Sequence, residues 1–387
     1  MSNKAAVVEQ VGSPVVIKTV EKYTPGPDEI LVKNKVISFS PIEAKMQKYA
    51  AIPYSVPAIL GFSSAGTVET VGSNITYVKP GDRVVVLAPF DVTDPRTGHF
   101  QEYYIAFPRY TSKIPDSVSF ADASSVPANL VTIVGVMHTI FGPERPSPDG
   151  KKATSKGKKL LVYGGSSSVG GYAIKYASDL GYDVITTSSS QNKDFVASLG
   201  ARSIVDHRQP AEKIVSELKS LGPFDAVFDA IGTPEPTAII GQVLAETGGG
   251  TIFTTLPEFG DIAAYARPES VARVYQSWPE VLDREELKEL VEWTYHVYIP
   301  EGLESGAIIS TRNVEVPGGV EGIQKILDKS LEGGALFYTI TVARQLALLK
   351  KETIDVRHLE DSIKVSGKFD KYLGEVHSQI KDKETAR

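Results

Sequence analysis

The sequence predicts an α/β protein in which a β-rich first part is followed by a doubly wound parallel sheet. Residues 4–107 carry short alternating or apolar runs broken by Gly, Pro and Asn, which is typical of strands. Residues 159–256 alternate short apolar strands with helices that end on glycine, which is typical of βαβ units with helices on both faces of a sheet. A chain of 387 residues exceeds the size at which one hydrophobic core keeps growing, so two domains are expected.

In the first part, six runs predict strands, at residues 5–10, 15–20, 29–37, 66–71, 82–89 and 102–107. The sequences PGPD at 25–28 and KPGD at 79–82 precede two of these strands, and their Pro and Gly preset turn dihedrals. Residues 120–141 are predicted to form a largely buried helix. The Pro- and Lys-rich stretch 142–159 after it is predicted to be a solvated loop.

In the second part, strands are predicted at 159–163, 183–187, 203–206, 225–231 and 250–256, separated by helices at 169–180, 193–199, 211–220 and 237–245. Two later helices are predicted at 285–298 and 319–331. From residue 350 the chain is charged and loses its periodicity, a composition that favours a disordered tail. The predicted parts of the chain are therefore a β-rich first part at 1–125, a doubly wound domain at 126–300, and a last part with an atypical charged tail at 301–387.

The composition excludes several classes of protein. The chain has no cysteine, which excludes disulfides, thiol nucleophiles, iron–sulfur clusters and cysteine-ligated zinc. A net charge of −6 with dispersed basic residues argues against nucleic-acid binding. No apolar run approaches the roughly 18 residues that a membrane helix needs, and the first residues lack the apolar run of a signal peptide. A cytoplasmic protein without membrane contact is expected.

The glycine turn at residues 164–171 carries the strongest chemical signal. Gly165 and Gly170 occupy the first and last places of G-x-G-x-x-G, and Ser167 takes the middle place. Such a turn between a strand and a helix lets the backbone approach a pyrophosphate, which the helix N-terminus then binds. The turn therefore predicts a dinucleotide site, against the alternative of a purely structural turn. The hydrolase elbow G-x-S-x-G fails because Val169 stands where its last glycine is required.

The end of the second strand of this domain indicates which dinucleotide binds. An NAD enzyme carries an Asp or Glu there for the ribose 2′-hydroxyl, whereas this chain has Ser189, Asn192 and Lys193 and no carboxylate before Asp194. Hydroxyls and a lysine suit a 2′-phosphate, so the sequence predicts NADP(H). The alternative is that the Ser/Asn run is only a helix-capping loop.

No metal site is predicted. The six histidines show no ligand spacing, and each is expected to be an ordinary surface or core residue.

With these motifs, the chain resembles the medium-chain dehydrogenase/reductase superfamily over residues 4–335. The shared features are PGPDEILVK, VKPGDRV, HFQEYYIAFP, GGSSSVG and the LGA at 199–201. Zinc-dependent members carry a Cys near residues 41–45 and a G-H-E near Leu60, where this chain has Phe62 for the histidine, so it resembles the zinc-free quinone reductases and the fungal enoyl reductases that act in trans.

The resemblance implies a GroES-like catalytic domain at 1–125, a Rossmann NADP-binding domain at 126–300, and a return of the chain to the catalytic domain at 301–387. Together with the motifs it assigns the following residues to the cofactor: Ile42, Glu43, Ala44, Lys45, Gly165, Ser166, Ser167, Ser168, Val169, Gly170, Ser189, Asn192, Lys193, His207, Thr255, Leu256, Val365 and Ser366.

The implied reaction is hydride transfer from NADPH to an activated C=C of an enoyl thioester, enone or quinone, without a metal. The growing enolate charge then needs hydrogen-bond donors. Lys45, expected on a loop, and Thr132, in the buried helix, are the candidate catalytic residues, with Tyr54 as a third. Each could instead be structural.

The alternative function is an NADPH-binding structural or regulatory protein with little turnover. The implied partners are a small or carrier-bound enoyl substrate and a polyketide synthase served in trans, with the chain a monomer or homodimer.

Overall fold

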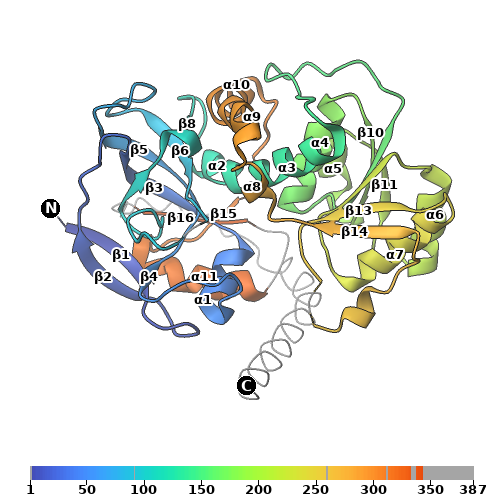
Figure 1. Ribbon diagram of the computed structural model, residues 1–387, viewed down its shortest axis with the longest axis horizontal. Helices are drawn as coiled ribbons and strands as arrows, with labels where there is room; N and C mark the ends of the chain where they lie inside the picture. Colours follow the sequence, from blue (N-terminus) through green and yellow to red (C-terminus); the bar gives the residue numbers. More distant parts are fainter. Residues whose placement is uncertain (1, 91, 259, 311–312, 333–336, 343–387) are drawn as a thin grey trace. The chain divides into compact units, whose positions relative to one another are not determined.

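The structure is a computed structural model, which describes residues 2–90, 92–258, 260–310, 313–332 and 337–342 (Figure 1). The described residues form two compact units. Unit 1 runs up to Ala128 and resumes at Ser310, and unit 2 is Asn129–Ile309. The sequence placed these junctions at 125/126 and 300/301. The second junction lies later because the helical run that begins near residue 285 continues through α10 (Ile299–Ser305).

Unit 1 is built on antiparallel strands. β3 lies inside the larger sheet, whose order is β15-β16-β3-β5-β6-β8, and β7 also pairs with β3. A smaller sheet has the order β2-β1-β4. The strands are β1 (Ser2–Val8), β2 (Val16–Glu21), β3 (Ile30–Phe39), β4 (Ala58–Ile59), β5 (Ser63–Val71), β6 (Arg83–Leu87), β7 (Tyr103–Ala106), β8 (Thr111–Lys113), β15 (Asn313–Glu315) and β16 (Phe337–Thr341). All six predicted strands are confirmed, whereas β4, β8, β15 and β16 are too short or too late in the chain for their pattern to stand out.

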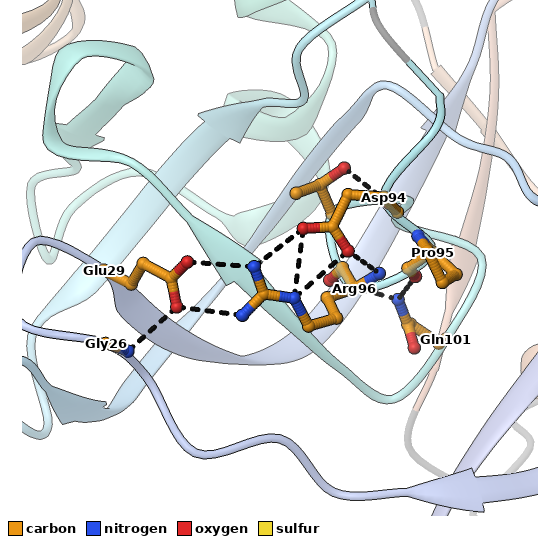
Figure 2. Close-up of polar contacts among 7 residues, drawn as sticks. Gly26, Glu29, Asp94, Pro95, Arg96 and Gln101 are labelled. Carbon is orange, nitrogen blue, oxygen red and sulfur yellow. Dashed lines mark hydrogen bonds and ion pairs between the residues drawn. The ribbon is translucent and has the colours of Figure 1, made fainter.

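An ion cluster stabilises the loop between β6 and β7 in unit 1 (Figure 2). The Arg96 guanidinium donates to both carboxylate oxygens of Glu29 at 3.1 Å and, through Nη2, to Asp94 Oδ2 at 2.8 Å. Glu29 also accepts the Gly26 N–H at 2.9 Å. Bidentate charge-assisted bonds of this kind hold geometry strongly. The cluster therefore connects the PGPD turn to a loop almost 70 positions further along the chain.

Unit 2 contains a parallel sheet with the strand order β11-β10-β9-β12-β13-β14. Leu161 and Tyr163 of β9 belong to a core cluster with residues of α6 and α7, and Leu160 and Val162, on the opposite face, are fully buried as well. Both faces are therefore covered, and the predicted doubly wound sheet is confirmed. The strands are β9 (Lys159–Tyr163), β10 (Asp183–Ser188), β11 (Ala201–Asp206), β12 (Ala226–Asp229), β13 (Gly250–Thr254) and β14 (Val271–Tyr275).

The helices of unit 2 match the predicted positions closely. They include α4 (Ser168–Asp179), α5 (Lys193–Ser198), α6 (Ala211–Leu221) and α7 (Pro234–Ala245). The predicted helix at 285–298 is more irregular than expected. It consists of a 3-10 turn (Glu285–Leu287), α9 (Lys288–Trp293) and a π-helical turn (Thr294–Tyr298).

The predicted helix at 120–141 is present as α2 (Phe120–Ser124) and α3 (Val126–Phe141), separated at Ser125. This segment corrects one expectation from the sequence, because by length and composition it could cross a membrane. Its most apolar window is 67% buried inside the protein, as expected for a core helix.

The predicted helix at 319–331 is present in unit 1 as a 3-10 turn (Gly319–Gly322) followed by α11 (Ile323–Glu332). Val365, Ser366 and the charged tail lie outside the described residues.

Candidate functional site

The glycine turn follows β9 and leads into α4, as its sequence requires. A Cβ at Gly165 would lie 2.1 Å from Thr186 Oγ1, and a Cβ at Gly170 would lie 2.2 Å from the Gly164 carbonyl oxygen. Both positions therefore exclude any side chain. The turn is also tied to the next strand, because the Gly164 N–H donates to Thr187 Oγ1 at 2.9 Å.

Ser167 explains why the middle glycine of the motif is absent. Its hydroxyl donates to the Gly164 carbonyl at 2.7 Å and accepts the Gly170 N–H at 3.0 Å, so Ser167 is the N-cap of α4. Its side chain is thus bound within the turn. Ser166, Ser168 and Val169 are half-buried beside it. The N-terminus of a twelve-residue helix with this cradle suits a phosphate anion.

The predicted 2′-phosphate residues gather where β10 ends. Ser189 is buried, and its hydroxyl oxygen accepts a hydrogen bond from Asn192 Nδ2 at 3.2 Å. Lys193 is exposed at the start of α5. His207 is exposed at the end of β11, which is the neighbour of β10 in the sheet.

Arg208 is a residue that the sequence reasoning missed. Its Nη2 donates to Gln191 Oε1 at 3.1 Å, which brings a second cation to the end of β10. The only sequence signal was its place two residues after the end of a predicted strand.

Thr255 and Leu256 follow β13, which lies in the half of the sheet formed by β12, β13 and β14. Thr255 Oγ1 donates to the Ala230 carbonyl at 3.3 Å, and the Leu256 side chain lies against Gly232. The predicted residues of unit 2 thus share the carboxyl edge of one parallel sheet. The direction of strand succession reverses between β9 and β12, and dinucleotides bind at such a switch point.

In unit 1, the structure corrects the expectation that residues 42–45 form a loop. They lie in the first turns of α1 (Pro41–Tyr49), which Ser40 caps. The sequence holds the signals of a helix start that were overlooked: a Ser at the N-cap, a Pro at the first position and a Glu at the third. Lys45 and Ile42 are therefore half-buried helical residues.

Glu43 and Ala44 are fully buried, so neither side chain is presented to solvent. One carboxylate oxygen of Glu43 accepts the Ser40 N–H at 2.9 Å, and the other accepts the Phe62 N–H at 3.4 Å. Burial raises the pKa of Glu43 to about 7, even though these backbone hydrogen bonds favour the ionised form. This carboxyl group stabilises the helix start.

The other predicted catalytic residues are spread over both units. Tyr54, in unit 1, donates its hydroxyl to the Met46 carbonyl at 3.1 Å, and burial raises its pKa to about 12. Thr132 lies in unit 2, half-buried within α3. Lys45 and Thr132 thus come from different units, as Lys45 belongs to α1.

The region around Phe62, where the resemblance implies a histidine in zinc-dependent members, does not fit a zinc ion. Phe62 occupies the histidine position and stacks on Phe90 with 4.8 Å between ring centroids. The Glu43 carboxylate is occupied by two N–H donors. Within the described residues, no group of three or more His, Cys, Asp or Glu side chains could hold a metal ion.

Comparisons with known proteins agree with this architecture. A family described as "Alcohol dehydrogenase GroES-like domain" matches residues 26–116, and one described as "Zinc-binding dehydrogenase" matches residues 168–258. The trans-enoyl reductase himH of Aspergillus japonicus is 32% identical over 310 residues, which cover 79% of this chain and 86% of that protein. The zinc in the second family description does not fit the residues around Phe62.

Solved structures share the fold. A quinone oxidoreductase of Pseudomonas syringae pv. Tomato is 21% identical with a TM-score of 0.67, and the match covers 87% of this chain and 99% of that one. A mycobacterial protein complexed with NADPH is 22% identical with a TM-score of 0.66, and the match covers 88% of this chain and 100% of that one. The predicted GroES-like and Rossmann fold class is confirmed. The chain therefore belongs to the medium-chain dehydrogenase/reductase family of oxidoreductases.

Proposed function

We propose that this protein is an NADPH-dependent reductase that transfers hydride to an activated C=C without a metal. One observation carries the proposal: the glycine turn and the N-terminus of α4 adjoin a β10 end that offers Ser189, Asn192 and Lys193 and no carboxylate. The name of the relative from Aspergillus japonicus, a trans-enoyl reductase, supports the C=C class of substrate.

The residues at the carboxyl edge of the unit 2 sheet fit the cofactor. Gly165 and Gly170 allow the tight strand-to-helix turn that brings the backbone close to a pyrophosphate, and the first N–H groups of α4 would bind it. Lys193 and Arg208 place two cations beside Ser189, where a 2′-phosphate would bind. When bound, NADPH supplies the hydride, and the protein contributes orientation and charge stabilisation.

The substrate carbonyl requires a donor for its developing negative charge. Lys45 offers an ammonium group and Thr132 a neutral hydroxyl. We propose that one of them donates to this oxygen. The enzyme would act in the cytosol, as a monomer or homodimer, on a carrier-bound enoyl chain delivered by a polyketide synthase or on a smaller enone or quinone.

Titrating NADPH and NADH separately against the protein's intrinsic fluorescence tests the cofactor. Tighter binding of NADPH by tenfold or more is expected, and equal or tighter binding of NADH would contradict the assignment. NADPH oxidation is then followed with enoyl thioesters, enones and quinones. NADPH binding without turnover of any of them would favour the alternative of a structural or regulatory NADPH-binding protein.

A further inference from the structure

Asp229, the last residue of β12, organises the loop that follows it. Its side chain is fully buried. Oδ1 accepts the N–H groups of Ile231 at 2.9 Å and Gly232 at 3.0 Å. A single carboxylate oxygen that accepts two successive backbone donors determines the path of residues 230–232, which we call the 230–232 loop.

The 230–232 loop is also attached to β9, to β14 and to the residue that follows β13. The Ala230 N–H donates to the Tyr163 carbonyl of β9 at 3.0 Å, and the Ala230 carbonyl accepts Thr255 Oγ1 at 3.3 Å, just after β13. Arg273 of β14 donates from Nη2 to the Gly232 carbonyl at 2.8 Å. These bonds, together with those to Asp229, hold the loop in the arrangement seen in the structure.

This loop contacts both halves of the candidate dinucleotide site. A Cβ at Gly164, in the glycine turn, would lie 2.6 Å from the Ile231 side chain. At the other end, a Cβ at Gly232 would lie 2.8 Å from Leu256 Cβ. The loop thus packs between the glycine turn and the residues after β13, at the switch point between β9 and β12.

We propose that Asp229 is a positioning residue for the dinucleotide: its ionised carboxylate holds the 230–232 loop in the arrangement that binds the cofactor, and its protonation weakens that binding. This inference rests on the proposed function. The residue cannot touch the ligand itself, because it is fully buried.

The Asp229 carboxyl group is protonated within a range of pH that an experiment can cover. Burial raises the pKa of Asp229 to about 6, while the backbone hydrogen bonds and the Arg273 charge oppose the shift. In the described part of the chain, its Oδ2 has no hydrogen-bond partner. Tyr163 of β9 interacts electrostatically with Asp229 and also with Glu235 of α7. The groups that interact electrostatically with Arg273, besides Asp229, are Glu258, Tyr265 and Arg267 of the segment between β13 and β14.

The experiment measures the dissociation constant for NADPH from pH 5 to pH 8 in wild-type protein and in Asp229→Asn. The asparagine keeps an acceptor for the two N–H groups but cannot ionise, and charge-assisted bonds are about twice as strong as neutral ones. We expect the variant to bind about tenfold more weakly at pH 8 and almost as tightly as wild type at pH 5. Using the ratio of the two constants cancels the titration of the cofactor's own 2′-phosphate, whose second pKa is about 6.

Asp179→Asn is the matched control, because it removes another buried carboxylate of unit 2. Asp179 lies at the C-terminal end of α4, where it pairs with Lys175, and a twelve-residue helix places it about 17 Å from the glycine turn. Its ratio to wild type should stay near one at every pH. Thermal melting of each variant shows whether it is folded.

A second variant keeps the test valid if Asp229→Asn does not fold. Arg273→Met removes a cation that lowers the Asp229 pKa, so the acid weakening of NADPH binding should begin at a higher pH than in wild type. The inference about Asp229 would be overturned if the ratio of the NADPH dissociation constants of Asp229→Asn and wild type were constant with pH. It would also be overturned if Arg273→Met weakened NADPH binding at the same pH as wild type. Neither result would affect the proposed function. Failure of wild-type protein to bind either NADPH or NADH would overturn the proposed function as well.

Discussion

Glu43→Gln should reduce the pH dependence of the protein's stability. The folded protein holds this carboxyl group at a pKa of about 7, against 4.5 for an ordinary glutamate. The folded state therefore binds this proton more tightly than the unfolded state, so the contribution of Glu43 to stability is most favourable below about pH 4.5 and falls as the pH rises to about 7. One pKa unit corresponds to 1.36 kcal/mol, so Glu43 lowers the free energy of unfolding by about 2 to 3 kcal/mol between pH 5 and pH 8.

Glutamine has nearly the same shape and keeps an oxygen that can accept the Ser40 N–H, but it does not titrate. The difference in unfolding free energy, variant minus wild type, should therefore rise by about 2 to 3 kcal/mol from pH 5 to pH 8. Urea denaturation followed by circular dichroism at several pH values measures this difference.

Glu21→Gln serves as the control, because Glu21 is an exposed glutamate on β2 of the same unit. Its difference from wild type should change little over this range of pH. A Glu43→Gln difference that is flat with pH would refute the reasoning, since it would mean that Glu43 is not held as a buried carboxyl group in the folded protein.

Four further predictions concern the site and its supports. Lys45→Ala should lower kcat/KM by roughly ten- to a thousandfold, from the loss of one charged donor worth about 1.5–4 kcal/mol, with the melting temperature kept; wild-type kinetics would exclude Lys45 from the reaction. Gly170→Ala should weaken NADPH binding at least tenfold, because its Cβ would lie 2.2 Å from the Gly164 carbonyl, and an unchanged titration would contradict this. Arg96→Met should destabilise the fold by about 1 to 2 kcal/mol in urea denaturation, because the Glu29 carboxylate loses the Arg96 guanidinium. The same substitution should leave the NADPH dissociation constant unchanged. Dialysis against a strong chelator should leave turnover unchanged, and a loss that zinc restores would argue for a metal enzyme.

Features that depend on residues adjacent in sequence could be predicted from the sequence. The glycine turn is one, because the steric need for glycine at Gly165 and Gly170 comes from the tight strand-to-helix connection itself. Strand and helix positions also followed from local periodicity. The helical position of Lys45 was missed, although the Ser40–Glu43 signals of a helix start were present in the sequence.

Only the tertiary structure determined which of these elements meet. The order β9-β12-β13 places Asp229 between the glycine turn and Thr255, and Arg273 of β14, 41 positions after Gly232, donates to that loop. The ion cluster around Arg96 likewise joins distant segments. Such contacts depend on how elements far apart in the sequence pack against one another. The periodicity of one strand indicates that one of its faces is buried, but it does not indicate which other element covers that face. By itself, the sequence therefore determined the tight glycine turn between strand and helix, while the sheet order decided which buried carboxylate organises the loop beside that turn.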